Sequence, residues 1–141
     1  MQLDYIVNID TKQKIEGEEE NLQIITHASF NGNKDDYTII YTEQNNENGE
    51  SKTELRCENG EKITVVRFGD EMTTHLILEK GRRHISCHNT PFGTFSMGIT
   101  ALEIDSDMDE KGGTLRFRYA TDIENNPLGE IVFDFTLKPK K

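Results

Sequence analysis

The segment IVFDFTL, residues 131–137, sets the fold class because bulky apolar residues occupy every second position. Successive side chains of a strand point to opposite faces, so Ile131, Phe133, Phe135 and Leu137 share one face. The same period of two recurs along the chain, and no segment shows a sustained helical period. We therefore predict an all-β protein.

Short turns separate the alternating segments. Asn59-Gly60 is a type I′ hairpin signal, and Gly81-Arg82 suits a type II′ turn with glycine in the first central position. A meander of hairpins leaves two unpaired edges unless it closes on itself. We predict a single domain over residues 1–141, folded as a closed antiparallel up-and-down β-barrel of about 8–10 strands. A β-sandwich is the alternative.

The apolar residues of segment 92–105 change parity between Ile99 and Leu102. One extra residue in a strand produces such a change, so we predict a β-bulge near Thr100 and Ala101.

Charge and targeting signals limit the choice of partners. The chain has 26 acidic and 16 basic residues, a net charge of −10. Phosphate binding needs a basic surface, so this balance argues against nucleic acid and against an anionic membrane. No apolar run approaches the roughly 20 residues of a membrane span, and the N-terminus has no signal-peptide pattern. We expect a cytoplasmic protein in which Cys57 and Cys87 are free and reduced.

Several short motifs occur in a specific order. They are Tyr41-Thr42-Glu43, Val66-Arg67-Phe68-Gly69, Asn89-Thr90-Pro91-Phe92-Gly93, Gly98-Ile99-Thr100, and Gly112-Gly113-Thr114-Leu115 followed by Tyr119. The pattern resembles the YwiB-like family of small bacterial proteins, whose function is unassigned. The resemblance implies a calycin-like β-barrel, the architecture of lipocalins and fatty-acid-binding proteins. It transfers no catalytic residue, and a fold alone does not license a function. The positions that match the family pattern are Tyr41, Glu43, Arg67, Gly69, Thr90, Pro91, Gly93, Thr100 and Tyr119.

Arg67 is the leading candidate for a ligand-binding residue. It shares a strand face with Ile63 and Val65, and a buried arginine is costly unless it is paired. On one interpretation it is a structural plug near a barrel end, bonded to backbone carbonyls or to Glu43. On another it binds the carboxylate or phosphate of a ligand, because a guanidinium fits these groups bidentately. The opposite face of the same segment can equally be the inner one, which would place Arg67 outside.

Two histidines form a weaker candidate. A turn at Gly81-Arg82 sets Lys80 opposite Arg83 and therefore His75 opposite His88. Directly opposed residues have Cβ atoms about 5 Å apart, so this pair is a candidate metal site. The alternative is that both histidines decorate the outer wall, because the same register gathers an apolar, core-facing set from Leu76, Leu78, Ile85 and Cys87.

No convergent group of catalytic side chains stands out, so we expect a protein that is not an enzyme and uses no cofactor. The leading hypothesis is that the barrel interior binds a small, partly apolar, acidic molecule through Arg67, Tyr41, Glu43 and Tyr119. The two tyrosines are either part of this site or ordinary core residues. The alternative is a barrel filled with side chains that works as a protein-interaction or regulatory module. We expect a monomer or a weak homodimer.

Overall fold

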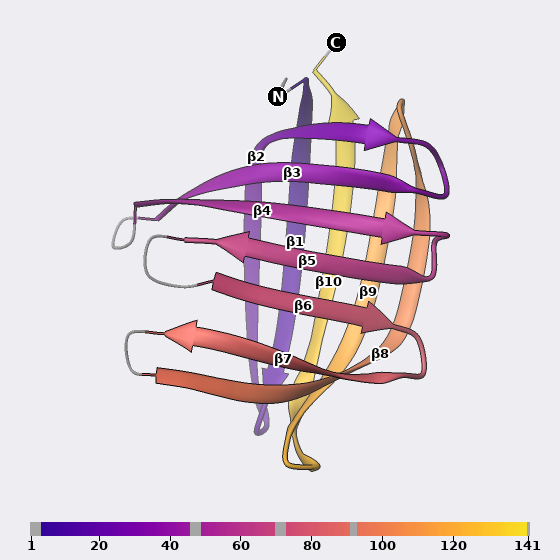
Figure 1. Ribbon diagram of the computed structural model, residues 1–141. Coiled ribbons are helices and arrows are strands. Elements are labelled where there is room, and N and C mark those ends of the chain that lie inside the picture. Colours follow the sequence, from indigo (N-terminus) through magenta and orange to yellow (C-terminus); the bar gives the residue numbers. More distant parts are fainter. Residues whose placement is uncertain (1–3, 46–48, 70–72, 91–92, 141) are drawn as a thin grey trace.

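The computed structural model describes residues 4–45, 49–69, 73–90 and 93–140. None of these segments forms a helix that is long and apolar enough to cross a membrane. The described residues form ten strands (Figure 1): β1 (Tyr5–Ile15), β2 (Glu18–Gly32), β3 (Tyr37–Asn45), β4 (Gly49–Glu58), β5 (Lys62–Phe68), β6 (Thr73–Glu79), β7 (Arg83–Thr90), β8 (Gly93–Asp109), β9 (Gly112–Ile123) and β10 (Asn126–Pro139).

Each strand pairs antiparallel with its neighbours along the chain, and β1 also pairs with β10, so the sheet closes into a barrel. In Figure 1, β1, β9 and β10 lie along one axis, upright in the view, and β3 to β7 cross them in a second layer. The long strands β2 and β8 bend, so that one part of each lies along β1, β9 and β10 and the other part lies along β3 to β7. The predicted closed antiparallel barrel is confirmed, and the β-sandwich alternative is wrong.

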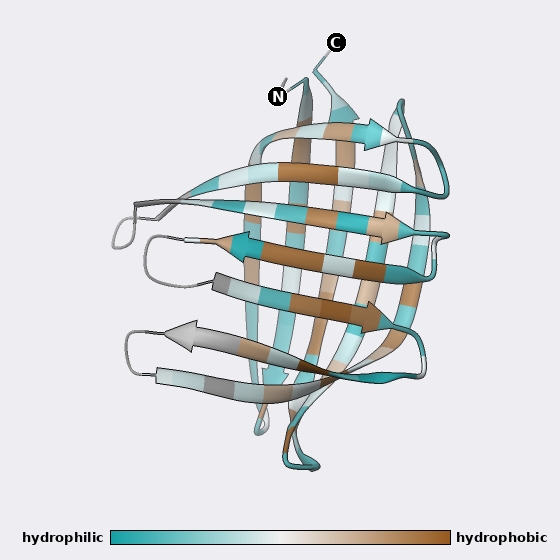
Figure 2. Cartoon of the chain, viewed as in Figure 1, coloured by the Kyte–Doolittle hydropathy of each residue, from teal (hydrophilic) through white to brown (hydrophobic). Residues whose placement is uncertain are grey.

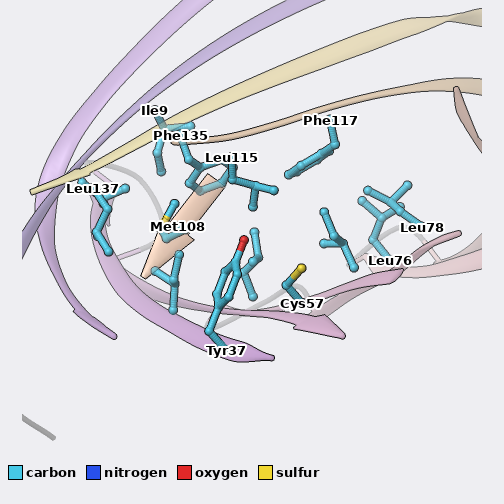
Figure 3. Close-up of a cluster of buried hydrophobic side chains, with 14 of the residues drawn as sticks. Ile9, Tyr37, Cys57, Leu76, Leu78, Met108, Leu115, Phe117, Phe135 and Leu137 are labelled. Atoms are coloured by element: carbon cyan, nitrogen blue, oxygen red, sulfur yellow. The ribbon is translucent and has the colours of Figure 1, made fainter. Parts of the chain in front are cut away.

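The interior is packed by the inner faces that the alternation predicted. Phe135 and Leu137 of β10 are buried, and they pair in register with the buried Ile9 and Val7 of β1. Hydropathy accordingly alternates along the strands (Figure 2). The close-up of the core brings together side chains from both layers (Figure 3), among them Tyr37, Cys57, Leu76, Met108, Leu115 and Phe117.

Strand β8 contains the predicted bulge. Its ladder with β9 skips Leu102, between Ala101 and Glu103. Ile99 is buried before this point and Met108 after it, although one position is odd and the other even. The extra residue therefore keeps both halves of the strand facing the core.

The turn between β6 and β7 differs from the prediction by one residue. The Arg82 N–H donates to the Glu79 carbonyl at 3.0 Å, so Lys80 and Gly81 are the two central residues. Gly81 has a φ of +77° and therefore takes the second central position, as in a type II turn. The prediction had placed glycine first.

The predicted faces of β7 are reversed, because β7 has one more residue than β6 between the Glu79–Arg82 bridge and the Thr74–His88 pair. Ile85 is 55% exposed and Cys87 is also exposed, whereas Ser86 is buried. A slip of one residue moves every side chain of a strand to the other face. The prediction that Ile85 and Cys87 face the core was therefore wrong.

Candidate functional site

The inner face of β3 changes from apolar to polar toward the end of the strand. Tyr37, Ile39 and Tyr41 are buried, and Glu43 follows on the same face with 14% of its side chain exposed. Thr53 of β4 pairs in register with Tyr41 and is also buried. The interior therefore has a polar end, which we call the mouth of the barrel.

Arg67 lies on the inner face of β5. Ile63 is fully buried, Val65 packs against the core, and Arg67 follows at the mouth, in register with Thr53. Its Nη2 donates to Oε2 of Glu43 at 3.2 Å, and 45% of its side chain is exposed. Of the two parities that the sequence left open, the structure adopts the inward one. We call the resulting group of side chains the mouth cluster: Tyr41, Glu43, Thr53 and Arg67.

The electrostatics of the mouth cluster keep the phenol of Tyr41 protonated. Burial, together with the negative charge of Glu43, raises the pKa of Tyr41 to about 12. A hydrogen bond with Thr53 and the charge of Arg67 act in the opposite direction, and they are weaker. The phenol of Tyr41 is therefore a hydrogen-bond donor at neutral pH, beside the ion pair of Arg67 and Glu43.

Aromatic side chains form a wall next to the mouth cluster. Tyr41 meets Phe135 edge-on, with ring centroids 6.1 Å apart. Phe135 stacks on Phe117 at 5.8 Å, and Phe117 stacks on Phe133 at 5.1 Å. Phe133 is only partly buried, so the wall is accessible at this point. We call Phe117, Tyr119, Phe133 and Phe135 the aromatic wall.

Tyr119 belongs to the aromatic wall and not to the mouth cluster. Its ring stacks on Phe133 at 6.2 Å, with an interplanar angle of 9°, and burial raises the pKa of its phenol. The structure thus brings Arg67, Glu43 and Tyr41 together, and it links Tyr119 to them through other rings.

Sequence reasoning did not single out the polar residues that β4 contributes. Ser51 and Thr53 are both buried, and Ser51 pairs in register with Glu43. The signal was present, because Ser51 and Thr53 share the parity of Leu55 and Cys57, which fill the core. The inner face of β4 thus turns polar at the same end as that of β3.

The predicted histidine pair is wrong. Residue Thr74, and not His75, pairs in register with His88. The turn of the β6–β7 hairpin is displaced by one residue, and β7 has one more residue than β6 between the Glu79–Arg82 bridge and this pair. His75 is exposed on the outer face. Within the described ranges, no three His, Cys, Asp or Glu residues are placed to hold a metal ion. His84 instead contacts Glu79, with Nε2 and Oε1 3.2 Å apart.

Comparisons with known proteins give one family and one solved structure. A family model described as "Domain of unknown function (DUF1934)" matches residues 7–134. The crystal structure of the ywiB protein from Bacillus subtilis is similar in fold, with a TM-score of 0.77 and 19% sequence identity. The match covers 97% of this chain and 92% of that one. None of the curated proteins matches the chain.

Proposed function

We propose that this chain, which belongs to the DUF1934 family, is a non-catalytic barrel that binds a small, partly apolar acid at its mouth. The ion pair between Arg67 and Glu43 on the inner face of the barrel carries the proposal. In the described part of the chain only Nη2 of Arg67 is hydrogen-bonded, and nearly half of the side chain is exposed. A guanidinium in this state has N–H groups left to bind a second carboxylate.

Glu43 orients the guanidinium of Arg67 and leaves its other N–H groups available to a ligand. An arginine that points into a barrel needs a partner, because desolvating an unpaired charge is costly. Glu43 meets this need through one oxygen of its carboxylate. The phenol of Tyr41, protonated at neutral pH, adds a second donor beside the pair. A ligand carboxylate would thus meet donors from two strands.

The charge of the chain requires that the ligand also has an apolar part. A net charge of −10 repels anions at long range, so a bare anion gains little at this mouth. The aromatic wall supplies the remaining contact surface, since Phe133 is partly buried and lies beside Tyr119. The chemistry of the site thus favours an amphipathic acid.

The same proposal places the protein in the cytoplasm and assigns it no cofactor. Its support is the pair of unlinked thiols, because a reducing compartment keeps cysteines free. Cys57 is buried in the core, and Cys87 lies exposed on the outer face of β7.

A second candidate function is protein interaction through the outer wall. Phe68 of β5 is 47% exposed and Ile85 of β7 is 55% exposed, and both point away from the interior. Val66 and Ile77 are partly exposed between them on the same outer face. Exposed apolar side chains that gather on one face are typical of interaction surfaces.

Calorimetric titration with decanoate and decanol tests the first proposal. Arg67→Met should weaken decanoate binding at least about tenfold, since a hydrogen bond to a charged group is worth roughly 1.5–3 kcal/mol. Decanol binding should stay unchanged. Arg56→Met is the matched control, because Arg56 is an arginine on the outer face of β4 with 66% of its side chain exposed. Equal losses for both ligands, or none for decanoate, would contradict the proposal.

Native mass spectrometry of the protein purified from its own host separates the two candidates. A bound acid that solvent extraction releases from the wild type, and that is lost with Arg67→Met, supports the mouth site. A ligand-free barrel that carries a protein partner, lost on Ile85→Lys, supports the outer wall instead.

A further inference from the structure

The strand β2 has one edge that the barrel does not use. On one side it pairs with β1 from Glu18 to Ala28, but on the other it pairs with β3 only from Ala28 to Gly32. On the N-terminal side of Ala28, the described part of β2 has no further ladder with β3. The last contact between them is a hydrogen bond from Oγ1 of Thr26 to the carbonyl of Thr42, at 2.8 Å. Figure 1 shows β2 continuing past the crossing strands.

The segment Glu18–Ile25 therefore carries backbone groups without a ladder partner on one side, among the residues that the structure describes. Such groups form a template for a further strand. Leu22 and Ile25 are 58% and 65% exposed, more than any other large hydrophobic side chain in the described ranges. They point to opposite faces of the strand. An added strand would cover both while completing the hydrogen bonds.

The negative charge of this edge favours a basic partner over a second copy of the chain. Glu18, Glu19 and Glu20 are exposed and consecutive, and they line an open hollow of about 500 Å³ together with Glu16 at the hairpin tip. In a chain with a net charge of −10, a row of glutamates on a free edge opposes pairing with a second copy. The same row attracts lysine or arginine side chains on a foreign strand.

We propose that the free edge of β2, residues Glu18–Ile25, binds an extended basic segment of another polypeptide by antiparallel strand addition. In strand addition, main-chain hydrogen bonds provide affinity for any extended segment, and contacts of alternate side chains provide the specificity. Apolar residues of the partner lie opposite Leu22 and Ile24 on the inward face. Basic residues of the partner lie opposite the three glutamates.

A capped octapeptide, Thr-Val-Thr-Val-Thr-Lys-Lys-Lys, is the probe that follows from this register. Its first residue lies opposite Ile25, its two valines lie opposite Ile24 and Leu22, and its three lysines lie opposite Glu20, Glu19 and Glu18. The control peptide has the same sequence with glutamate in place of lysine. Binding is measured by NMR titration of the full-length protein, with amide hydrogen exchange read for β2.

Binding of the lysine peptide should slow exchange of the β2 amides between Glu18 and Ile25 and shift their resonances first. The triple variant Glu18→Lys, Glu19→Lys, Glu20→Lys should weaken binding at least tenfold. The matched control reverses three exposed turn glutamates, Glu61, Glu110 and Glu124, and should bind as the wild type does. The glutamate peptide should not bind.

Three results would overturn the proposal. One is the absence of peptide binding at millimolar concentration. Another is binding that survives the β2 triple variant or is lost equally in the control variant. The third is a concentration-dependent dimer of the wild type in sedimentation, abolished by Ile25→Lys and kept in Ile85→Lys, which would show that a second copy occupies this edge.

Discussion

Replacing Phe117 by alanine should destabilise the barrel by about 3–5 kcal/mol. Phe117 is 1% exposed, and its ring lies 5.1 Å from that of Phe133, 5.8 Å from that of Phe135 and 6.3 Å from that of Tyr119. A buried aromatic residue removes roughly 150–250 Å² from water, which at about 25 cal/mol per Å² amounts to roughly 4–6 kcal/mol. Alanine keeps part of this area, and the cavity left behind adds to the loss, which gives the stated range.

Urea unfolding followed by tyrosine fluorescence measures the effect, since the chain has no tryptophan. Domains of this size have free energies of unfolding of about 5–15 kcal/mol, so the variant should fold with a much lower midpoint and an unchanged slope. Ile85→Ala is the control, because Ile85 is 55% exposed and should cost less than about 1 kcal/mol. A loss below about 1 kcal/mol for Phe117→Ala would refute the inner face assigned to β9.

Gly98→Ala should lower the melting temperature, because a Cβ at this position would lie 2.3 Å from Oδ1 of Asp122 and 2.5 Å from Nε and Nη2 of Arg83; in an Arg83→Ala, Asp122→Ala background most of this loss should vanish. Raising the pH should also destabilise the protein. Tyr41 has a pKa of about 12 in the folded state against an ordinary value of 10.0. The folded chain thus keeps a proton that the unfolded chain loses, so its contribution to the free energy of unfolding is full below pH 10 and declines above it, as denaturant titrations across this range would show. A thiol reagent should modify Cys87 at once and Cys57 only after unfolding, because Cys57 is fully buried and burial raises its pKa; two fast equivalents would contradict this assignment.

The sequence allowed prediction of the fold class because an antiparallel sheet with one buried face imposes a period of two on its strands. The choice of a barrel over a sandwich rested on the short hairpin turns and on the unpaired edges that closure removes. The bulge in β8 was predictable as well, since apolar residues on both sides of Leu102 had to reach the same core. The motifs identified the family, which the match over residues 7–134 confirms. The predicted pairing of β6 with β7 was wrong for two reasons. A single glycine suits either central position of a two-residue turn, and the positive φ of Gly81 places it second. In addition, β7 has one more residue than β6 between the Glu79–Arg82 bridge and the Thr74–His88 pair.

The mouth cluster was only partly predictable. Arg67 and Glu43 were named as possible partners, and they do pair, because both end an inward-facing apolar series at the same end of the barrel. Thr53 was missed, although its parity matches that of Leu55 and Cys57, because threonine is mostly exposed in proteins. The free edge of β2 was not predictable at all. It depends on where β3 separates from β2 at Thr42, which is a property of the bend and leaves no pattern in the sequence.

The interior of the barrel is apolar along most of its length and carries an ion pair at the mouth. The interior of a small closed barrel can be filled by side chains, and close-packed apolar side chains are the stable filling. Away from the mouth the interior is filled with apolar side chains, among which Ile39, Leu55 and Ile63 are fully buried. At the mouth the chain places an ion pair instead, although an ion pair often stabilises a fold no better than apolar residues of the same volume. The Arg67–Glu43 pair therefore adds little to folding that Met and Leu could not supply, and the ligand binding that we propose for the mouth would give it a purpose.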